Sequence, residues 1–345
     1  MSNSQARRSE QAGIFHFFRE MGSALIMALI AIVYVIQAFK IPTGSMEDSL
    51  LVGDFLLGLK FMYGAPILPF SQELGITTRF PAVTDPKAGD VIIFRYPGND
   101  KKDYIKRCVA GPGSVVEVRG KSLIVDGKVV QTPPRGKYLN DGQLDEKITD
   151  FKPLKIPAKG DIIKTGDLQT REFLFLKHLI RQENPRSKVR AEFQLYLDGE
   201  FSNNQTIQMI DPYTRQGFRI AFGDLRFDHD DWTRLEDLLS YVKSSFSDRE
   251  VEIKKLLYIN DKPVNEYKVK YDNYFMMGDN RDNSLDSRYW GFLNRNYVKA
   301  KAFILYFSLD KQIPAWQLPV KIRWERIGKL IRSWDGIAGI PSTAN

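Results

Sequence analysis

The chain has 345 residues, 43% hydrophobic and 27% charged, which excludes a disordered protein and allows one large or two modest domains. Its net charge of +8 comes from basic and acidic residues mixed along the whole chain, so we expect no nucleic-acid partner and favour contact with membrane lipid. The single cysteine, Cys108, excludes an internal disulfide and a cysteine-rich zinc site, and the three histidines lack ligand spacing. We therefore expect neither a metal nor another cofactor.

Residues 21–39 form an uncharged run near the N-terminus. Its length of about 19 residues approaches the roughly 20 that a helix needs to cross a bilayer, so it predicts one transmembrane helix. A cleavable signal peptide is the alternative, but the run exceeds the usual apolar region of about 7–15 residues and no small-x-small site ends it. Arginines in residues 1–20 and acidic residues soon after Lys40 place the N-terminus in the cytoplasm and the rest outside.

The run leads into the stretch 41–46, which reads Ile-Pro-Thr-Gly-Ser-Met. Pro42 and Gly44 disfavour a continuing helix, because proline lacks an N–H and glycine loosens the backbone. The Ser45 hydroxyl is thus expected close to a membrane surface, within reach of a polypeptide in that membrane. An ordinary turn after a membrane anchor is the alternative interpretation.

The next part of the chain has the pattern of antiparallel strands. Residues 50–60, 91–96 and 104–109 predict strands, and residues 115–130 predict a hairpin around Asp126-Gly127, a favoured type I′ pair. Residues 63–84 are rich in proline, glycine and aromatic residues and predict an exposed loop. We assign residues 40–130 to the first part of a β domain.

Residues 131–252 have a different pattern and predict an inserted α+β subdomain. Helical spacing of apolar residues appears at 171–181 and 232–246, and residues 193–201 predict a hairpin around Asp198-Gly199. No chemistry is evident in this block.

The β pattern returns in residues 253–310, which we assign to the second part of the β domain. It includes a hairpin at 256–264, a short buried strand at 274–277 and a dense polar turn at 278–284. In the tail, 311–345, apolar and basic residues alternate so that 321–334 predicts a basic amphipathic helix, which either lies on a membrane or packs on the protein.

A serine nucleophile needs a base, and Lys106 is the candidate that the sequence offers. It lies in an apolar strand, where burial would lower the pKa of the amine toward neutrality and so allow the neutral form. His229 is flanked by three aspartates and fits a solvated turn better than a Ser-His-Asp triad. A lysine whose amine simply reaches solvent at a strand edge is the alternative.

Four stretches together resemble the bacterial type I signal peptidases. In chain order they are Pro-Thr-Gly-Ser-Met at 42–46, Gly-Asp-Val-Ile-Ile-Phe at 89–94, Tyr-Ile-Lys-Arg at 104–107, and Gly-Asp-Asn-Arg-Asp-Asn-Ser-Leu-Asp-Ser-Arg at 278–288. The likeness covers roughly residues 20–130 and 256–310. Asp48, Ala110 and Ser114 depart from the common pattern, and none of them is in the catalytic pair.

The resemblance implies roles for individual residues. Ser45 would be the nucleophile and Lys106 the general base, with the Thr43 hydroxyl and the Ser45 backbone N–H as the oxyanion hole. Ser284 would hydrogen-bond the Lys106 amine. The other implied residues support the site or line the substrate groove: Asp279, Asp286 and Arg288 as support, and Phe39, Ile41, Met46, Asp103, Tyr104 and Ile105 in the groove.

The fold class that follows is mainly β: an antiparallel β catalytic domain, one N-terminal transmembrane helix and an inserted α+β subdomain. The resemblance implies an endopeptidase that removes signal peptides from exported preproteins at the outer face of the bacterial cytoplasmic membrane. Its partners would be signal peptides and membrane lipid, with the protein-export machinery nearby. Two rival functions remain open: a self-cleaving peptidase with the same Ser/Lys pair, and an inactive membrane-anchored β module that binds exported proteins.

Overall fold

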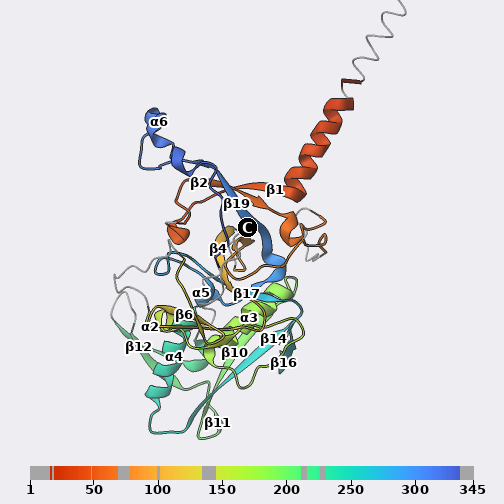
Figure 1. Ribbon diagram of the computed structural model, residues 1–345. Coiled ribbons are helices and arrows are strands. Elements are labelled where there is room, and N and C mark those ends of the chain that lie inside the picture. Colours follow the sequence, from red (N-terminus) through yellow and green to blue (C-terminus); the bar gives the residue numbers. More distant parts are fainter. Residues whose placement is uncertain are drawn as a thin grey trace, which may run out of the picture.

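The structure is a computed structural model that describes residues 16–17, 19–47, 49–68, 78–98, 102–133, 145–210, 216–225 and 231–334 (Figure 1). The predicted cytoplasmic segment 1–20 falls largely outside these residues, as do residues 69–77 of the predicted loop 63–84 and His229 itself.

The N-terminal run is helical only in part. Residues 19–30 are α-helical and continue as the π-helix η1 (Ala31–Val35), and this helix projects away from the rest of the molecule in Figure 1. The chain then becomes strand β1 (Ile36–Lys40), which pairs with β2 (Asp54–Leu59) from Ile36 opposite Leu59 to Lys40 opposite Phe55. The prediction of one helix over 21–39 is therefore wrong at its C-terminal end, because β2 supplies backbone partners there. Among the described residues, no helix has both the length and the hydropathy needed to cross a membrane.

One seven-stranded antiparallel sheet organises the first and last parts of the chain. Its order is β1-β2-β19-β3-β4-β17-β18, so strands from both ends of the sequence alternate in it. The remaining strands of the sheet are β3 (Val91–Arg95), β4 (Asp103–Ala110), β17 (Asn273–Met277), β18 (Leu293–Asn294) and β19 (Val298–Ser308). This confirms the predicted antiparallel β class.

Between β4 and β17 the chain forms smaller sheets and two long helices, α3 (Thr170–Glu183) and α4 (Trp232–Ser245). Both helices and their hairpins occur where the sequence predicted them. The strands here are β5 (Val115–Arg119), β6 (Ser122–Val125), β7 (Lys128–Val130), β8 (Leu154–Lys155), β9 (Ile162–Lys164), β10 (Val189–Leu197), β11 (Glu200–Phe201), β12 (Thr206–Ile210), β13 (Gly217–Ala221), β14 (Val251–Ile259), β15 (Lys262–Val264) and β16 (Glu266–Lys268). Because β5 pairs with β8 and β14 pairs with β10, the segment outside the large sheet begins at β5 and ends at β16, a wider range than 131–252.

Short helical turns connect these elements. They are η2 (Gly44–Met46), η3 (Phe61–Tyr63), α2 (Glu146–Thr149), η4 (Phe222–Asp224), α5 (Ser287–Trp290), η5 (Arg295–Tyr297), η6 (Ala315–Gln317), α6 (Leu318–Lys321) and η7 (Trp324–Arg326).

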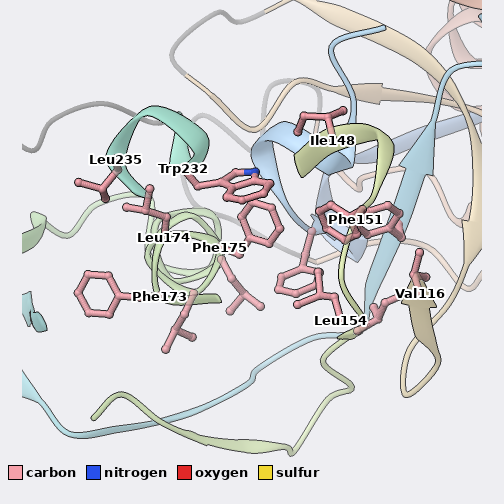
Figure 2. Close-up of a cluster of buried hydrophobic side chains, with 14 of the residues drawn as sticks. Val116, Ile148, Phe151, Leu154, Phe173, Leu174, Phe175, Trp232 and Leu235 are labelled. Carbon is pink, nitrogen blue, oxygen red and sulfur yellow. The ribbon is translucent and has the colours of Figure 1, made fainter. Parts of the chain in front are cut away.

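Aromatic packing joins the two parts of the molecule. Figure 2 shows Phe151, Phe175 and Trp232 around one point, with ring centroids 6.2–6.5 Å apart. Phe275 of β17 reaches the same cluster, 5.6 Å from Phe151. Such pairs are worth roughly 0.5–1.5 kcal/mol beyond their buried area. The strand that precedes the polar turn 278–284 is thus packed against this aromatic cluster.

Hairpin turns form where the sequence placed them. The central residues of the turns at Asp126-Gly127, Asp198-Gly199 and Asn260-Asp261 all have positive φ, between 49° and 81°. Both central residues of a type I′ turn require this conformation, and Asp, Asn and Gly adopt it most readily.

The predicted amphipathic helix at 321–334 is wrong. Gly328 has a φ of +81°, and the backbone of the following residues bonds to β19, with the Ile331 N–H donating to the Phe303 carbonyl at 2.7 Å. Arg326, expected on a solvated helix face, is 5% exposed and forms an ion pair with Asp54. Backbone hydrogen bonds to β19 and the ion pair with the buried Asp54 carboxylate determine the conformation of residues 321–334. The apolar spacing alone does not reveal these partners.

Candidate active site

The candidate nucleophile and base come together from distant parts of the chain. Ser45 lies in η2, directly after β1, and Lys106 lies on β4. The Lys106 Nζ donates a hydrogen bond to the Ser45 Oγ. The pairing predicted from the sequence is therefore present in the fold.

Burial controls the electrostatics of Lys106, whose residue is only 4% exposed. Loss of hydration disfavours the ammonium form and lowers the pKa of the amine from 10.5 to about 8, with a smaller lowering by Arg288. The charges of Asp286 and Asp279 oppose this change. A substantial fraction of the amine is consequently neutral near pH 8.

Thr43 lies beside the nucleophile. Its Oγ1 is 3.5 Å from the Ser45 Oγ, and its side chain is exposed. The hydroxyl is therefore accessible to a molecule that approaches Ser45 from solvent.

The polar turn after β17 holds the backbone of the nucleophile. The Asn280 N–H donates to the Ser45 carbonyl at 3.1 Å, and the Asn280 side chain donates to the Gly44 carbonyl at 3.2 Å. Gly278 makes this approach possible, because a Cβ there would lie 2.5 Å from the Ser45 carbonyl oxygen and would overlap Ser284. Only glycine fits at this position without moving η2.

Asp279 forms an ion pair with Arg107, the residue directly after the candidate base Lys106. Its two carboxylate oxygens accept from the Arg107 Nε at 2.8 Å and Nη2 at 2.7 Å, and the same guanidinium donates to the Gly89 carbonyl at 2.7 Å. Both side chains are buried. This bidentate ion pair ties β4 to the turn after β17 and so fixes Lys106 relative to that turn.

Asp286 and Arg288 form a second buried pair, as the resemblance implied. The Arg288 Nε and Nη2 donate to the Asp286 carboxylate at 2.9 and 3.0 Å, and the Gly278 N–H donates to it at 3.1 Å. Burial by itself would raise the pKa of Asp286, but the Arg288 charge and these hydrogen bonds lower it. The carboxylate thus stays ionised, and its hydrogen bond with the N–H of Gly278 joins the start of the turn 278–284 to Asp286, just after its end.

Ser284 does not have the contact expected of it. Its Oγ is buried and has no hydrogen-bond partner among the described residues, while the Lys106 amine donates to Ser45. The hydroxyl packs against the backbone at Gly278 instead.

The residues implied in the substrate groove divide into two sets. Phe39, Ile41 and Met46 are 9%, 3% and 1% exposed and belong to the hydrophobic core beneath Ser45, with Ile105 packed against them. The Met46 sulfur also accepts the Asp279 N–H at 3.4 Å. In this structure Ile41 and Met46 are core residues that pack against the segment carrying Ser45.

The other two lie at the start of β4. Asp103 forms an ion pair with Lys299 at 2.7 Å, and the Tyr104 ring stacks on Tyr96 with 4.6 Å between centroids. Both are partly exposed and remain candidates for substrate contact.

Sequence reasoning missed Arg107, Gly278 and Asn280. In the sequence, Arg107 could have been noticed because it directly follows the candidate base. Gly278 and Asn280 could have been noticed because they belong to the polar turn. What each contacts depends on the approach of β4, η2 and the turn, which no spacing in the sequence reveals.

A serine hydroxyl hydrogen-bonded to a buried lysine amine is the arrangement of a hydrolase that uses a Ser/Lys pair. The sequence matches the family described as signal peptidase, peptidase S26, over residues 14–307. The chain belongs to this family of serine proteases.

Individual relatives carry the name signal peptidase I. One from Buchnera aphidicola subsp. Baizongia pistaciae is 28% identical over 306 residues, 89% of this chain and 80% of that relative. One from Helicobacter pylori strain J99 is 25% identical over 339 residues, 94% of this chain and 95% of that relative. A solved signal peptidase I from Enterococcus faecalis is 15% identical with a TM-score of 0.21, covering 63% of this chain and 97% of that one.

Proposed function

We propose that this protein is an endopeptidase that cleaves N-terminal signal peptides from exported preproteins, with Ser45 as nucleophile and Lys106 as general base. The hydrogen bond between the buried Lys106 amine and the Ser45 hydroxyl carries the proposal. Membership of the peptidase S26 family and the shared name of the relatives support the reaction class.

The chemistry follows from the protonation state of Lys106. The neutral amine accepts the Ser45 proton as the Oγ attacks the carbonyl carbon of the last signal-peptide residue, which gives a tetrahedral oxyanion. The resulting ammonium then donates that proton to the departing amine of the mature chain, and the peptide C–N bond breaks. Water, deprotonated by the same amine, hydrolyses the acyl-enzyme and regenerates Ser45.

The oxyanion would be bound by the Thr43 hydroxyl and the Ser45 backbone N–H. The exposed Thr43 hydroxyl, 3.5 Å from the nucleophilic oxygen, is close enough for this role. A donor of this type acts on charge that develops only in the transition state and is worth about 3 kcal/mol.

The buried pairs Asp279–Arg107 and Asp286–Arg288 would act as positioning groups. Each ties the turn after β17 to the site, to β4 in one case and to Gly278 in the other. Ser284, which lacks a hydrogen-bond partner among the described residues, would donate to the Lys106 amine only after its side chain moves away from Gly278.

We further propose that the chain is anchored in the cytoplasmic membrane by its N-terminal segment, with the sheet on the outer side. Many side chains of the helix preceding β1 are apolar and exposed, and so are Trp316, Val320 and Trp324 of the C-terminal segment. The helix and α6 both lie at the upper end of the molecule in Figure 1. A lipid surface at that end would cover these side chains and would bring Ser45 near a signal peptide in the same membrane.

The substrate would bind as an extended strand beside η2 and β4, with main-chain hydrogen bonds for affinity and shallow pockets for small side chains. Asp103, Tyr104 and Ile105 lie on the β4 side of this path. Phe39, Ile41 and Met46 form its floor.

The test is cleavage of a purified secretory precursor in detergent, followed by N-terminal sequencing of the product. Wild-type protein should cut once after a small-x-small site, and Ser45→Ala and Lys106→Ala should each abolish the cut. Cys108→Ala is the matched control, because the buried Cys108 is two residues from the base on the same strand, and most activity should remain.

Two outcomes would replace the proposal. Cleavage of the protein's own chain, lost in Ser45→Ala, with no cut in any precursor would indicate a self-cleaving peptidase. Binding of precursors without cleavage, unaffected by substitution of either residue of the pair, would indicate a binding module.

A further inference from the structure

A cavity of about 230 Å³ lies between the sheet and the helices, outside the candidate active site. Its apolar wall contains the rings of Tyr96, Tyr289 and Trp290, and Leu285, which is 48% exposed. Water occupies roughly 30 Å³ per molecule and drug-sized ligands need roughly 300–1,000 Å³. The cavity therefore has the size of a pocket for one large side chain.

The opposite wall is polar and comes from the two long helices. His178 and Arg181 of α3 and Asp231 at the start of α4 line it. The His178 Nδ1 lies 3.2 Å from the Trp290 carbonyl oxygen, so α3 and α5 are in direct contact at the edge of the cavity. A peptide there would find apolar surface for a side chain and polar groups for its backbone.

A line of aromatic contacts connects this cavity with the base. The Lys106 Nζ is 5.8 Å from the centroid of the Tyr104 ring, which stacks on Tyr96 at 4.6 Å. Tyr96 in turn meets Trp290 edge to face at 6.1 Å. An extended peptide advances about 3.3 Å per residue. By this path the Tyr96 side of the cavity is at most about three residues, and the Trp290 side at most about five residues, from a bond that is cleaved at Ser45.

The position of the helix tells which side of the cleaved bond reaches the cavity. The N-terminal helix leads into β1 at one edge of the sheet, whereas the cavity is built on α5, which follows β17 near the other edge. Figure 1 shows the helix at the upper end of the molecule and α5, α3 and α4 toward the lower end. A signal peptide in the membrane would come from the helix side, so the mature chain leaves toward the cavity.

We propose that this cavity, here called the mature-chain pocket, binds a large apolar side chain, aromatic by preference, at the third or fourth residue after the cleaved bond. The proposal rests on the proposed signal peptide cleavage and adds a preference on the mature side of the substrate. Aromatic rings favour partners in edge-to-face or offset stacks, and Tyr96 and Trp290 already have this geometry.

The experiment uses peptides that share one signal sequence ending in Ala-x-Ala and differ only in Phe or Ser at mature position three or four. Wild type should cleave the Phe peptide about tenfold more efficiently, in kcat/KM, at one of the two positions. Leu285→Ser removes an apolar wall and should reduce this preference to about twofold. Val129→Ser is the control, because Val129 is 53% exposed on β7, away from the cavity, and the preference should remain tenfold.

The outcomes separate this proposal from the proposed function. Equal cleavage of all peptides by wild type, or a Leu285→Ser variant that slows all of them in proportion, overturns the pocket and leaves the peptidase intact. Cleavage of none overturns both.

A second readout locates the contact directly. In the Ser45→Ala protein, a benzoylphenylalanine at the preferred position should cross-link to residues 96–98 or 285–290, as mapped by mass spectrometry. Cross-links confined to other segments would overturn the proposal.

Discussion

Lys106→Met should stabilise the protein although it destroys the candidate site. Methionine has nearly the length of lysine and carries no charge, so the substitution keeps the packing and removes an amine that is buried at 4% exposure. Burial lowers the pKa of that amine from 10.5 to about 8. Between pH 8 and 10.5 the unfolded chain binds a proton that the folded chain does not, so the free energy of unfolding rises with pH in this range. Below about pH 8 the folded state carries the full cost of the buried ammonium.

The magnitude follows from the same two pKa values. A difference from 10.5 to about 8 corresponds to about 3 kcal/mol at pH 6.5, where both states are protonated, and to about 1 kcal/mol at pH 9.5. The lost hydrogen bond to Ser45 offsets about 1 kcal/mol of this. We expect Lys106→Met to raise the free energy of unfolding by about 2 kcal/mol at pH 6.5 and to leave it nearly unchanged at pH 9.5.

Urea denaturation of wild type and variant at the two pH values measures this difference. Lys128→Met, at an exposed lysine on β7, is the control and should change stability little at either pH. A Lys106→Met protein that is less stable than wild type at pH 6.5, or a difference that does not vary with pH, would refute the claim that Lys106 is held in a site that disfavours its charge.

The remaining predictions concern the pH profile, one glycine and one buried ion pair. Because only neutral Lys106 acts as base, kcat/KM should fall about tenfold per pH unit below about 8, and a flat acid limb would contradict this role. Gly278→Ala should lower kcat at least about 100-fold with the fold retained by circular dichroism, because its Cβ would displace the Ser45 backbone; wild-type kcat would disprove the steric argument. Arg326→Met should lower the urea-derived free energy of unfolding by about 3–5 kcal/mol, because the Asp54 carboxylate stays buried without its partner. Adding Asp54→Asn to Arg326→Met should recover part of the lost free energy of unfolding. A double variant that is less stable than Arg326→Met would contradict the claim that the unpaired carboxylate causes the loss.

The candidate Ser/Lys pair and its supporting turn were predicted from four short stretches that resemble one family, because the local pattern by itself also fits an ordinary turn at Ser45 and a lysine that reaches solvent at Lys106. Pro42, Gly44 and Ser45 follow an apolar run, and Lys106 interrupts an apolar strand. The hairpin turns were predictable for a local reason, since the left-handed conformation that they need is cheap only for Gly, Asn and Asp.

Other features depended on partners far away in the chain. Residues 36–40 continue an apolar run that fits a helix, yet β2 pairs with them as a strand. The segment 321–334 has helical spacing, yet β19 and the buried Asp54 hold it in an irregular path. In both cases backbone and charge partners supplied by the fold outweighed the local periodicity.

The sequence by itself thus determined the antiparallel class, most strands and the two long helices, and its resemblance to the signal peptidases indicated Ser45 and Lys106 as the candidate pair. Tertiary structure alone decided that the Lys106 amine reaches the Ser45 hydroxyl, that Asp279 binds Arg107, and that Gly278 allows the turn to touch η2. The physical reason is that propensity and spacing act over a few residues, whereas burial, ion pairing and close backbone contact depend on strands that are distant in sequence and adjacent in one sheet.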